Sequence, residues 1–145
     1  MCQLSQGISM LYLLLLSILD MRFRKMPVWL LITGGMAASG YQIWKGIGGD
    51  VPSIALIIAG ATVGILFLGV SKITKEALGY GDGIVIFIMG IYLGFWNLAT
   101  VLMIAFFAAS ILSLFLLISK KSGRKMTMPF VPFLCIGYAM FILME

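Results

Sequence analysis

Apolar residues fall in six runs separated by short polar joints, and this pattern predicts a helical membrane protein. A helix that crosses the hydrocarbon core needs about 20 residues. The third and fifth runs reach that length and the second nearly does, whereas the fourth and sixth are short. We therefore expect an all-α integral membrane protein with about six transmembrane helices. The runs are approximately Leu4–Leu19, Pro27–Trp44, Pro52–Ser71, Gly83–Trp96, Leu98–Ser119 and Pro129–Met144.

The composition supports a place in the lipid bilayer. Hydrophobic residues make up 62% of the 145 residues and charged residues only 10%. A soluble domain needs more polar surface than this. At this length we expect one membrane-embedded domain over residues 1–145. The first run ends in an acid and three cations rather than a small-residue cleavage site, so it is interpreted as a span and not a signal peptide.

The cations are distributed unevenly among the polar joints. The joints 20–26, 72–82 and 120–128 hold nine of the ten Lys and Arg residues, and the joint 45–51 holds the tenth. Because positively charged loops stay in the cytoplasm, these three joints are predicted to face inward and both termini outward. Topology therefore explains the net charge of +5, and we expect no nucleic acid partner.

Metal and cofactor chemistry is not expected. The sequence has no histidine, which is the commonest metal ligand. Its two cysteines, Cys2 and Cys135, are far apart and do not form the clustered pairs of a zinc site. A structural disulfide is not expected either, because Cys135 lies inside an apolar run.

Two acids stand at the ends of apolar runs on the predicted cytoplasmic side. Asp20 closes the first run and Asp82 opens the fourth. Two carboxyl groups at one membrane face can hydrolyse a peptide bond, because one takes a proton from water while the other, protonated, polarises the scissile carbonyl. Simpler roles also fit these positions: an interfacial residue that balances nearby cations for Asp20, and a helix N-cap for Asp82. The remaining acids are interpreted as loop or terminal residues: Asp50, Glu76 and Glu145.

Three glycines surround Asp82 in the stretch Gly79-Tyr80-Gly81-Asp82-Gly83. Glycine permits backbone conformations closed to other residues and lets another chain approach closely, so Gly79, Gly81 and Gly83 are predicted to form an active-site loop. The run that follows has 14 residues. A helix of that length spans about 21 Å, less than the hydrocarbon core of about 30 Å. Asp82 is therefore expected below the inner interface, where an ionisable residue indicates function.

The sixth run is short like the fourth, so its start is also expected to lie inside the membrane. It reads Pro129-Phe130-Val131-Pro132-Phe133. Irregular backbone at membrane depth is tolerated where it lines a cavity. We therefore expect Pro129, Phe130 and Pro132 to line the substrate site.

Three stretches together resemble the type IV prepilin peptidases, members of the GxGD class of membrane aspartyl proteases. Leu19–Pro27 resembles the family's first-aspartate segment, an acid followed by basic residues and a proline. Glu76–Asp82 resembles the segment with the second aspartate, and Pro129–Leu134 a proline–phenylalanine motif near the C-terminal end. Gly-x-Gly-Asp alone is a weak signal, but the three stretches in this order span nearly the whole chain.

The resemblance implies a peptidase of the cytoplasmic membrane that removes the short basic leader of type IV prepilins or pilin-like proteins at the cytoplasmic face. In the family, cleavage follows a glycine and precedes the apolar helix of the substrate. Carried over to this sequence, Asp20 and Asp82 are the catalytic pair, and Gly79 and Gly81 shape the loop. Which aspartate is the base, and the oligomeric state, are left open.

The sequence departs from the family pattern in three places. Ile84 stands where many members have a lysine, and Val131 replaces a common glycine. The region with paired cysteines that large bifunctional members carry has no counterpart in this sequence. The resemblance is thus to a short form, with peptidase activity and without methyltransferase activity.

Two alternatives stay open at this stage. A non-enzymatic transporter or assembly subunit would use Asp20 and Asp82 as a proton or cation site. Signal-peptide-type and presenilin-type proteases also carry Gly-x-Gly-Asp, but they cut within transmembrane helices. The basic residues and proline after Asp20 favour cutting at the membrane surface, and archaeal preflagellin peptidases remain close neighbours.

Overall fold

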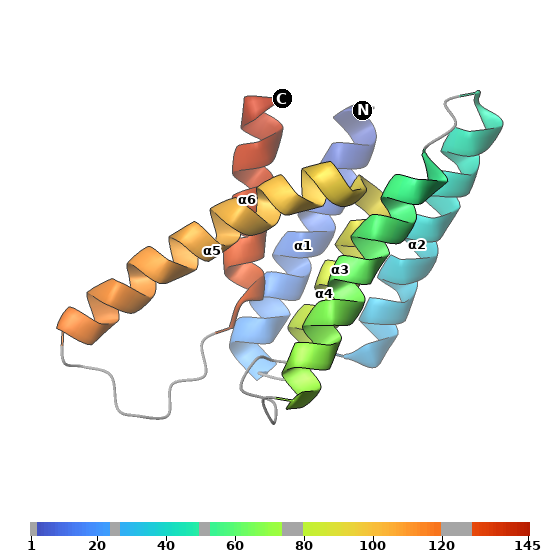
Figure 1. Ribbon diagram of the computed structural model, residues 1–145. Coiled ribbons are helices and arrows are strands. Elements are labelled where there is room, and N and C mark those ends of the chain that lie inside the picture. The colour runs from blue at the N-terminus through green and yellow to red at the C-terminus, as the bar shows by residue number, and fades with distance from the viewer. Residues whose placement is uncertain (1–2, 24–26, 50–52, 74–79, 120–128) are drawn as a thin grey trace. The chain divides into compact units, whose positions relative to one another are not determined.

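A computed structural model describes residues 3–23, 27–49, 53–73, 80–119 and 129–145, and in these residues the chain is all α-helical (Figure 1). The predicted fold class is therefore confirmed. Helices α1, α3 and α5 are long and apolar enough to cross a membrane, and α4 and α6 are shorter apolar helices. The outward orientation of both termini stays a prediction. The helices are α1 (Gln3–Phe23), α2 (Val28–Ile47), α3 (Ile54–Ile73), α4 (Tyr80–Leu93), α5 (Phe95–Ile118) and α6 (Val131–Met144).

Two helix boundaries differ from the apolar runs in a way that matters for the acids. Helix α1 continues to Phe23, so Asp20 lies within its last turn rather than at its end. Helix α4 begins at Tyr80, so Asp82 lies within its first turn. The runs were delimited by polarity, whereas a helix continues as long as its backbone N–H groups reach the carbonyls four residues earlier.

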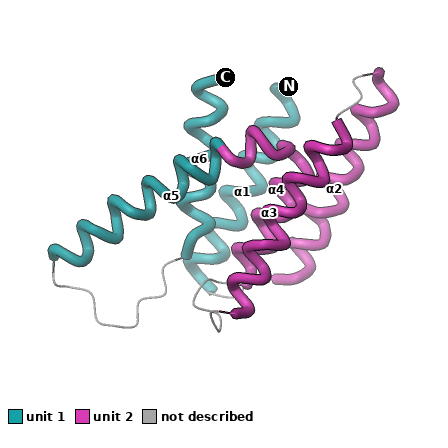
Figure 2. Tube along the Cα trace, in the orientation of Figure 1, with its two compact units in different colours: residues 1–24, 100–145 teal, residues 25–99 magenta. Residues whose placement is uncertain are grey.

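The chain divides into two compact units (Figure 2). Unit 1 comprises residues 1–24 and 100–145, with α1, α6 and most of α5. Unit 2 comprises residues 25–99, with α2, α3, α4 and the start of α5. A single domain over residues 1–145 stays a prediction.

In unit 2, α4 packs against both α3 and α2. The backbones of α3 and α4 approach so closely that glycine is required at the crossing. A Cβ atom added to Gly60 would lie 2.5 Å from the carbonyl oxygen of Gly90, and one added to Gly64 would collide with the Cα of Phe87. Apolar helices gain little from hydrophobicity against one another in lipid, so they associate through such close van der Waals contact between small residues.

The C-terminal end of α4 is held by a side chain of α2. The Nε2 group of Gln42 donates hydrogen bonds to the carbonyl oxygens of Ile91 (2.7 Å) and Tyr92 (3.0 Å). The rings of Tyr41 and Tyr92 pack with centroids 5.1 Å apart. The last carbonyls of a helix have no partner within the helix, and in an apolar environment they need one. Gln42 therefore supplies a C-terminal cap from a neighbouring helix.

Replacing Gln42 by leucine is expected to lower the free energy of unfolding by about 1–2 kcal/mol, because two interhelical hydrogen bonds are lost. The measurement is reversible unfolding of the purified protein in mixed detergent micelles. Ser39→Ala on the same helix is the matched control, since the exposed Ser39 hydroxyl donates only within α2, to the carbonyl of Gly35. Equal stability of the two variants would show that Gln42 does not hold α4.

In unit 1, α6 contacts both α1 and α5. The fully buried Tyr138 of α6 shares a 2.5 Å hydrogen bond with Ser9 of α1. Nearer the two chain termini, the side-chain amide of Gln6 donates a hydrogen bond of 2.5 Å to the carboxylate of Glu145. On the α5 side, a Cβ atom added to Gly137 would lie 2.7 Å from the carbonyl oxygen of Val101. The order of the two pairs between α1 and α6 makes these helices antiparallel (Figure 1).

Candidate active site

Asp82 is a buried acid in the first turn of an apolar helix. Its side chain is only 8% exposed. The first turn of a helix presents unsatisfied backbone N–H groups, and the helix dipole there favours negative charge. A carboxyl group is nonetheless costly to place in such apolar surroundings, which makes Asp82 a candidate for function rather than for stability.

The glycines next to Asp82 are helical, which differs from the expected loop. Gly81 and Gly83 belong to the first turn of α4, and Gly79 lies outside the described residues. A Cβ atom added to Gly83 would lie 2.8 Å from the Cδ2 atom of Leu68 and 3.3 Å from its backbone nitrogen. Gly83 therefore lets α3 pass close to the first turn of α4, and its own backbone is helical.

Asp20 lies on the buried face of α1. The buried residues Leu13, Leu16 and Ser17 precede it at helical spacing, so all four share one face. The Oδ2 atom of Asp20 is buried and has no hydrogen-bond partner among the described residues. A buried polar atom without a partner costs about 1–3 kcal/mol and calls for an explanation. A catalytic carboxyl that meets water and substrate is one such explanation.

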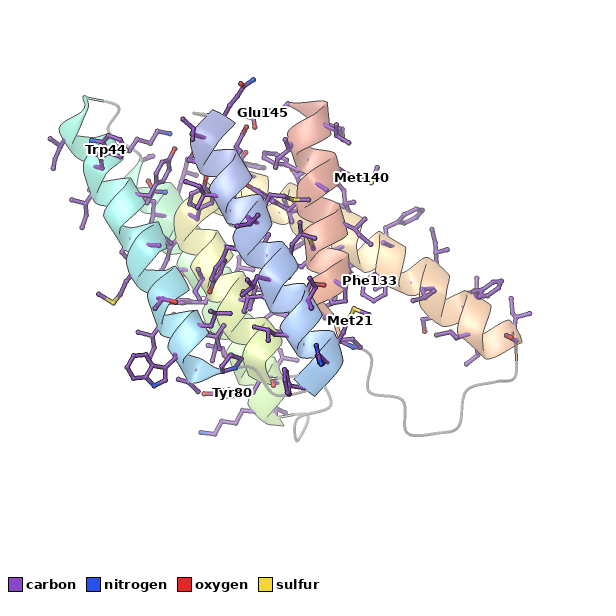
Figure 3. All side chains as sticks on the ribbon, turned by 180° about the vertical axis from the view of Figure 1, so that it is seen from behind. Met21, Trp44, Tyr80, Phe133, Met140 and Glu145 are labelled. Atoms are coloured by element: carbon purple, nitrogen blue, oxygen red, sulfur yellow. The ribbon has the colours of Figure 1, made fainter. Side chains whose placement is uncertain are left out.

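The start of α6 lies at the same end of unit 1 as Asp20. Figure 3 labels Met21 near the end of α1 and Phe133 near the start of α6, with Glu145 at the opposite end of unit 1. Because the pairs Ser9–Tyr138 and Gln6–Glu145 make α1 and α6 antiparallel, the C-terminal end of α1, which carries Asp20, and the start of α6 lie at the same end of unit 1. The structure thus brings Asp20 to the end of unit 1 that carries the proline–phenylalanine stretch.

The side chains of that stretch are partly packed. Phe130 is buried, and its ring lies 5.1 Å, centroid to centroid, from that of Phe106 in α5. Pro132 occupies the first turn of α6, where proline is tolerated because that N–H would have no partner in the helix. Pro129 is half-buried and precedes the helix. A role for Pro129, Phe130 and Pro132 in lining a substrate site stays a prediction.

The two acids belong to different units. Asp20 lies in unit 1 and Asp82 in unit 2, and the pairing of their carboxyl groups stays a prediction. Within the described residues, no group of three or more His, Cys, Asp or Glu side chains is arranged to hold a metal ion.

Sequence reasoning did not single out the two buried serines. Apart from Asp82, the buried polar side chains among the described residues are Ser17, on the face of Asp20, and Ser71, at the end of α3. A signal for Ser71 was present in the sequence: Gly60, Gly64 and Ser71 follow helical spacing and form one stripe of small residues on α3.

The helices and the acids together define a class: a helical membrane protein with two carboxyl groups placed at the ends of apolar helices. The model of the type IV leader peptidase family matches residues 7–118 of the chain. This range includes Asp20 and Asp82 and ends before Pro129. The chain belongs to the type IV leader peptidase family, and the predicted resemblance is confirmed. No curated protein and no solved structure matches the chain.

Proposed function

We propose that this protein is an aspartyl endopeptidase that removes the short basic leader of type IV prepilins or pilin-like proteins at the cytoplasmic face of the cytoplasmic membrane. Asp20 and Asp82 are the catalytic pair. The observation that carries the proposal is that the family match spans two acids, each within one turn of the end of an apolar helix. Carboxyl groups in such places are expensive and mark functional sites.

The chemistry follows from two carboxyl groups that share one proton. The ionised carboxylate removes a proton from water, and the resulting hydroxide attacks the scissile carbonyl carbon while the protonated carboxyl donates its proton to the carbonyl oxygen. The tetrahedral intermediate then collapses: the C–N bond breaks, the amine leaves with the proton that the first carboxyl had accepted from water, and a hydroxyl group of the intermediate returns its proton to the second carboxylate, which restores the singly protonated pair. Because the pair titrates as a unit, the roles of acid and base belong to the pair.

The proposed substrate suits a site at the membrane face. A pilin-like precursor has an apolar helix that stays in lipid and a basic leader that stays in water. The bond between them lies at the interface, at the level expected for acids one turn inside a helix end. Pro129, Phe130 and Pro132 are proposed to line the path of the substrate chain at the end of unit 1 that carries Asp20.

The test is cleavage of a purified pilin-like precursor by this protein reconstituted in lipid vesicles. Mass spectrometry is expected to find two products separated at the junction between the leader and the apolar helix. Uncleaved precursor under all conditions would overturn the proposal. Proton flux across the vesicle membrane without cleavage would support the transporter alternative instead.

A further inference from the structure

Helix α5 meets α6 through small residues on one face and through a pair of phenylalanine rings at the edge of that face. A Cβ atom added to Gly137 would lie 2.7 Å from the carbonyl oxygen of Val101 and 3.3 Å from the Cβ atom of Ala105. Phe106 follows Ala105, about 100° further around the helix. The ring of Phe106 lies 5.1 Å, centroid to centroid, from that of Phe130. Phe106 therefore lies at the rim of the contact between α5 and α6.

The two rings differ in exposure. Phe130 is 9% exposed, whereas Phe106 is 43% exposed, so part of the Phe106 ring stays open beside the buried one. Its neighbours Met103 and Phe107 are 75% and 71% exposed, as expected for side chains that face lipid. Phe106 thus combines a fixed place against α6 with a ring surface that another apolar group can cover.

The ring pair Phe106–Phe130 lies at the end of unit 1 that carries Asp20. Phe130 is the N-cap residue of α6, and the start of α6 lies at the same end of unit 1 as the last turn of α1. Beyond the ring pair, α5 leads away from the start of α6 (Figure 1), and the view from behind shows the same divergence (Figure 3). The open part of the Phe106 ring therefore lies where the two helices begin to separate, at the end of the unit where cleavage is proposed.

We propose that Phe106 is a specificity-determining residue that contacts the first turn of the substrate's apolar helix, just after the bond to be cut. The inference rests on the proposed peptidase function and extends it by one residue. A precursor held in lipid presents apolar side chains from the start of its helix. A large side chain makes more van der Waals contacts with the ring than a methyl group does. The protein is therefore expected to prefer precursors with a large apolar residue at the contact over precursors with alanine there.

The experiment is a double-mutant cycle between the protein and its precursor. Each residue in the first turn after the cut is replaced by alanine in turn, and kcat/KM is measured with the full-length wild-type protein, Phe106→Ala and the matched control Phe107→Ala. For the wild type, alanine at one of these substrate positions is expected to lower kcat/KM about tenfold. Phe106→Ala is expected to abolish that difference, whereas Phe107→Ala keeps it.

Three outcomes of the cycle would overturn the proposal. The wild type shows no preference at any of these positions, or the preference persists in Phe106→Ala, or Phe107→Ala abolishes it equally. A loss of activity in Phe106→Ala that is the same for every precursor counts as persistence, because the ring would then only support α6. Thermal unfolding in detergent checks that both variants are folded.

A second measurement does not depend on cleavage. A benzophenone amino acid replaces Phe106 or Phe107 in the Asp20→Asn variant, and light is used to cross-link it to the uncut precursor. Position 106 is expected to label the first turn of the precursor's apolar helix, and position 107 to label it much less. Equal labelling, or none, would contradict the contact. If the wild-type protein cleaves no precursor, the peptidase function fails, while the cross-link still decides whether position 106 contacts the precursor.

Discussion

Asp82→Asn and Asp20→Asn are each expected to lower kcat/KM for precursor cleavage by at least about a thousandfold. Asparagine keeps the shape of aspartate but can neither accept the proton of the attacking water nor donate one to the carbonyl oxygen. Because the two carboxyl groups act as one unit, the double variant should be no worse than either single one. The measurement is the rate of leader release in lipid vesicles.

The matched control is Asp50→Asn, the same change in a joint that the charge pattern predicts to face outward. Its activity should equal that of the wild type. The folded state of the two catalytic variants is checked by thermal unfolding in detergent, where they are expected to be at least as stable as the wild type, because each loses a buried ionisable group. Cleavage within tenfold of the wild-type rate in either variant would remove that aspartate from the mechanism.

Gly64→Ala is expected to destabilise the protein by about 3 kcal/mol. The added methyl group would collide with the Cα of Phe87, which is backbone and cannot rotate away. The helices α3 and α4 would have to separate along the whole contact that runs from Gly60 to Gly83. Activity should fall as well, because α4 carries Asp82 and its packing on α3 sets where that acid lies.

Gly69→Ala on the same helix is the control for this change. Nothing lies within 4 Å of a Cβ atom at Gly69, so alanine there meets open space. Since alanine favours a helix over glycine by about 0.5–1 kcal/mol, this variant should match or slightly exceed the stability of the wild type. Both are compared by reversible unfolding in mixed micelles. Equal stability of the two variants would mean that the close approach of α3 and α4 does not support the fold.

The helices and the two acids could be predicted from the sequence because both signals are local. In lipid no water is present to bond the backbone N–H and C=O groups, so an apolar run of this length favours a helix, in which most of these groups bond one another. An acid beside such a run is conspicuous for the same reason, and Asp20 and Asp82 needed no knowledge of their neighbours. Helix α1 continues to Phe23 and helix α4 begins at Tyr80, about one turn beyond the corresponding apolar runs. Polar side chains can occupy the terminal turn of a helix, so the polarity pattern places the helix ends too far inside.

The role of the glycines could be predicted only in part. Gly81 and Gly83 were noticed for their freedom of backbone conformation, yet both are helical. What Gly83 provides is room for Leu68, a residue 15 positions earlier in the sequence. The requirement depends on another helix and leaves no local trace beyond the glycine itself.

By itself, then, the sequence determined the all-helical membrane class, the family and the two acids, since each depends on hydrophobicity or on residues that are adjacent in the chain. The tertiary structure decided that Gly60 and Gly64 let α3 touch the backbone of α4, that Gln42 caps the end of α4, and that Ser71 is buried. These features arise where segments distant in sequence pack together, and in lipid such packing is selected by shape and hydrogen bonding rather than by hydrophobicity.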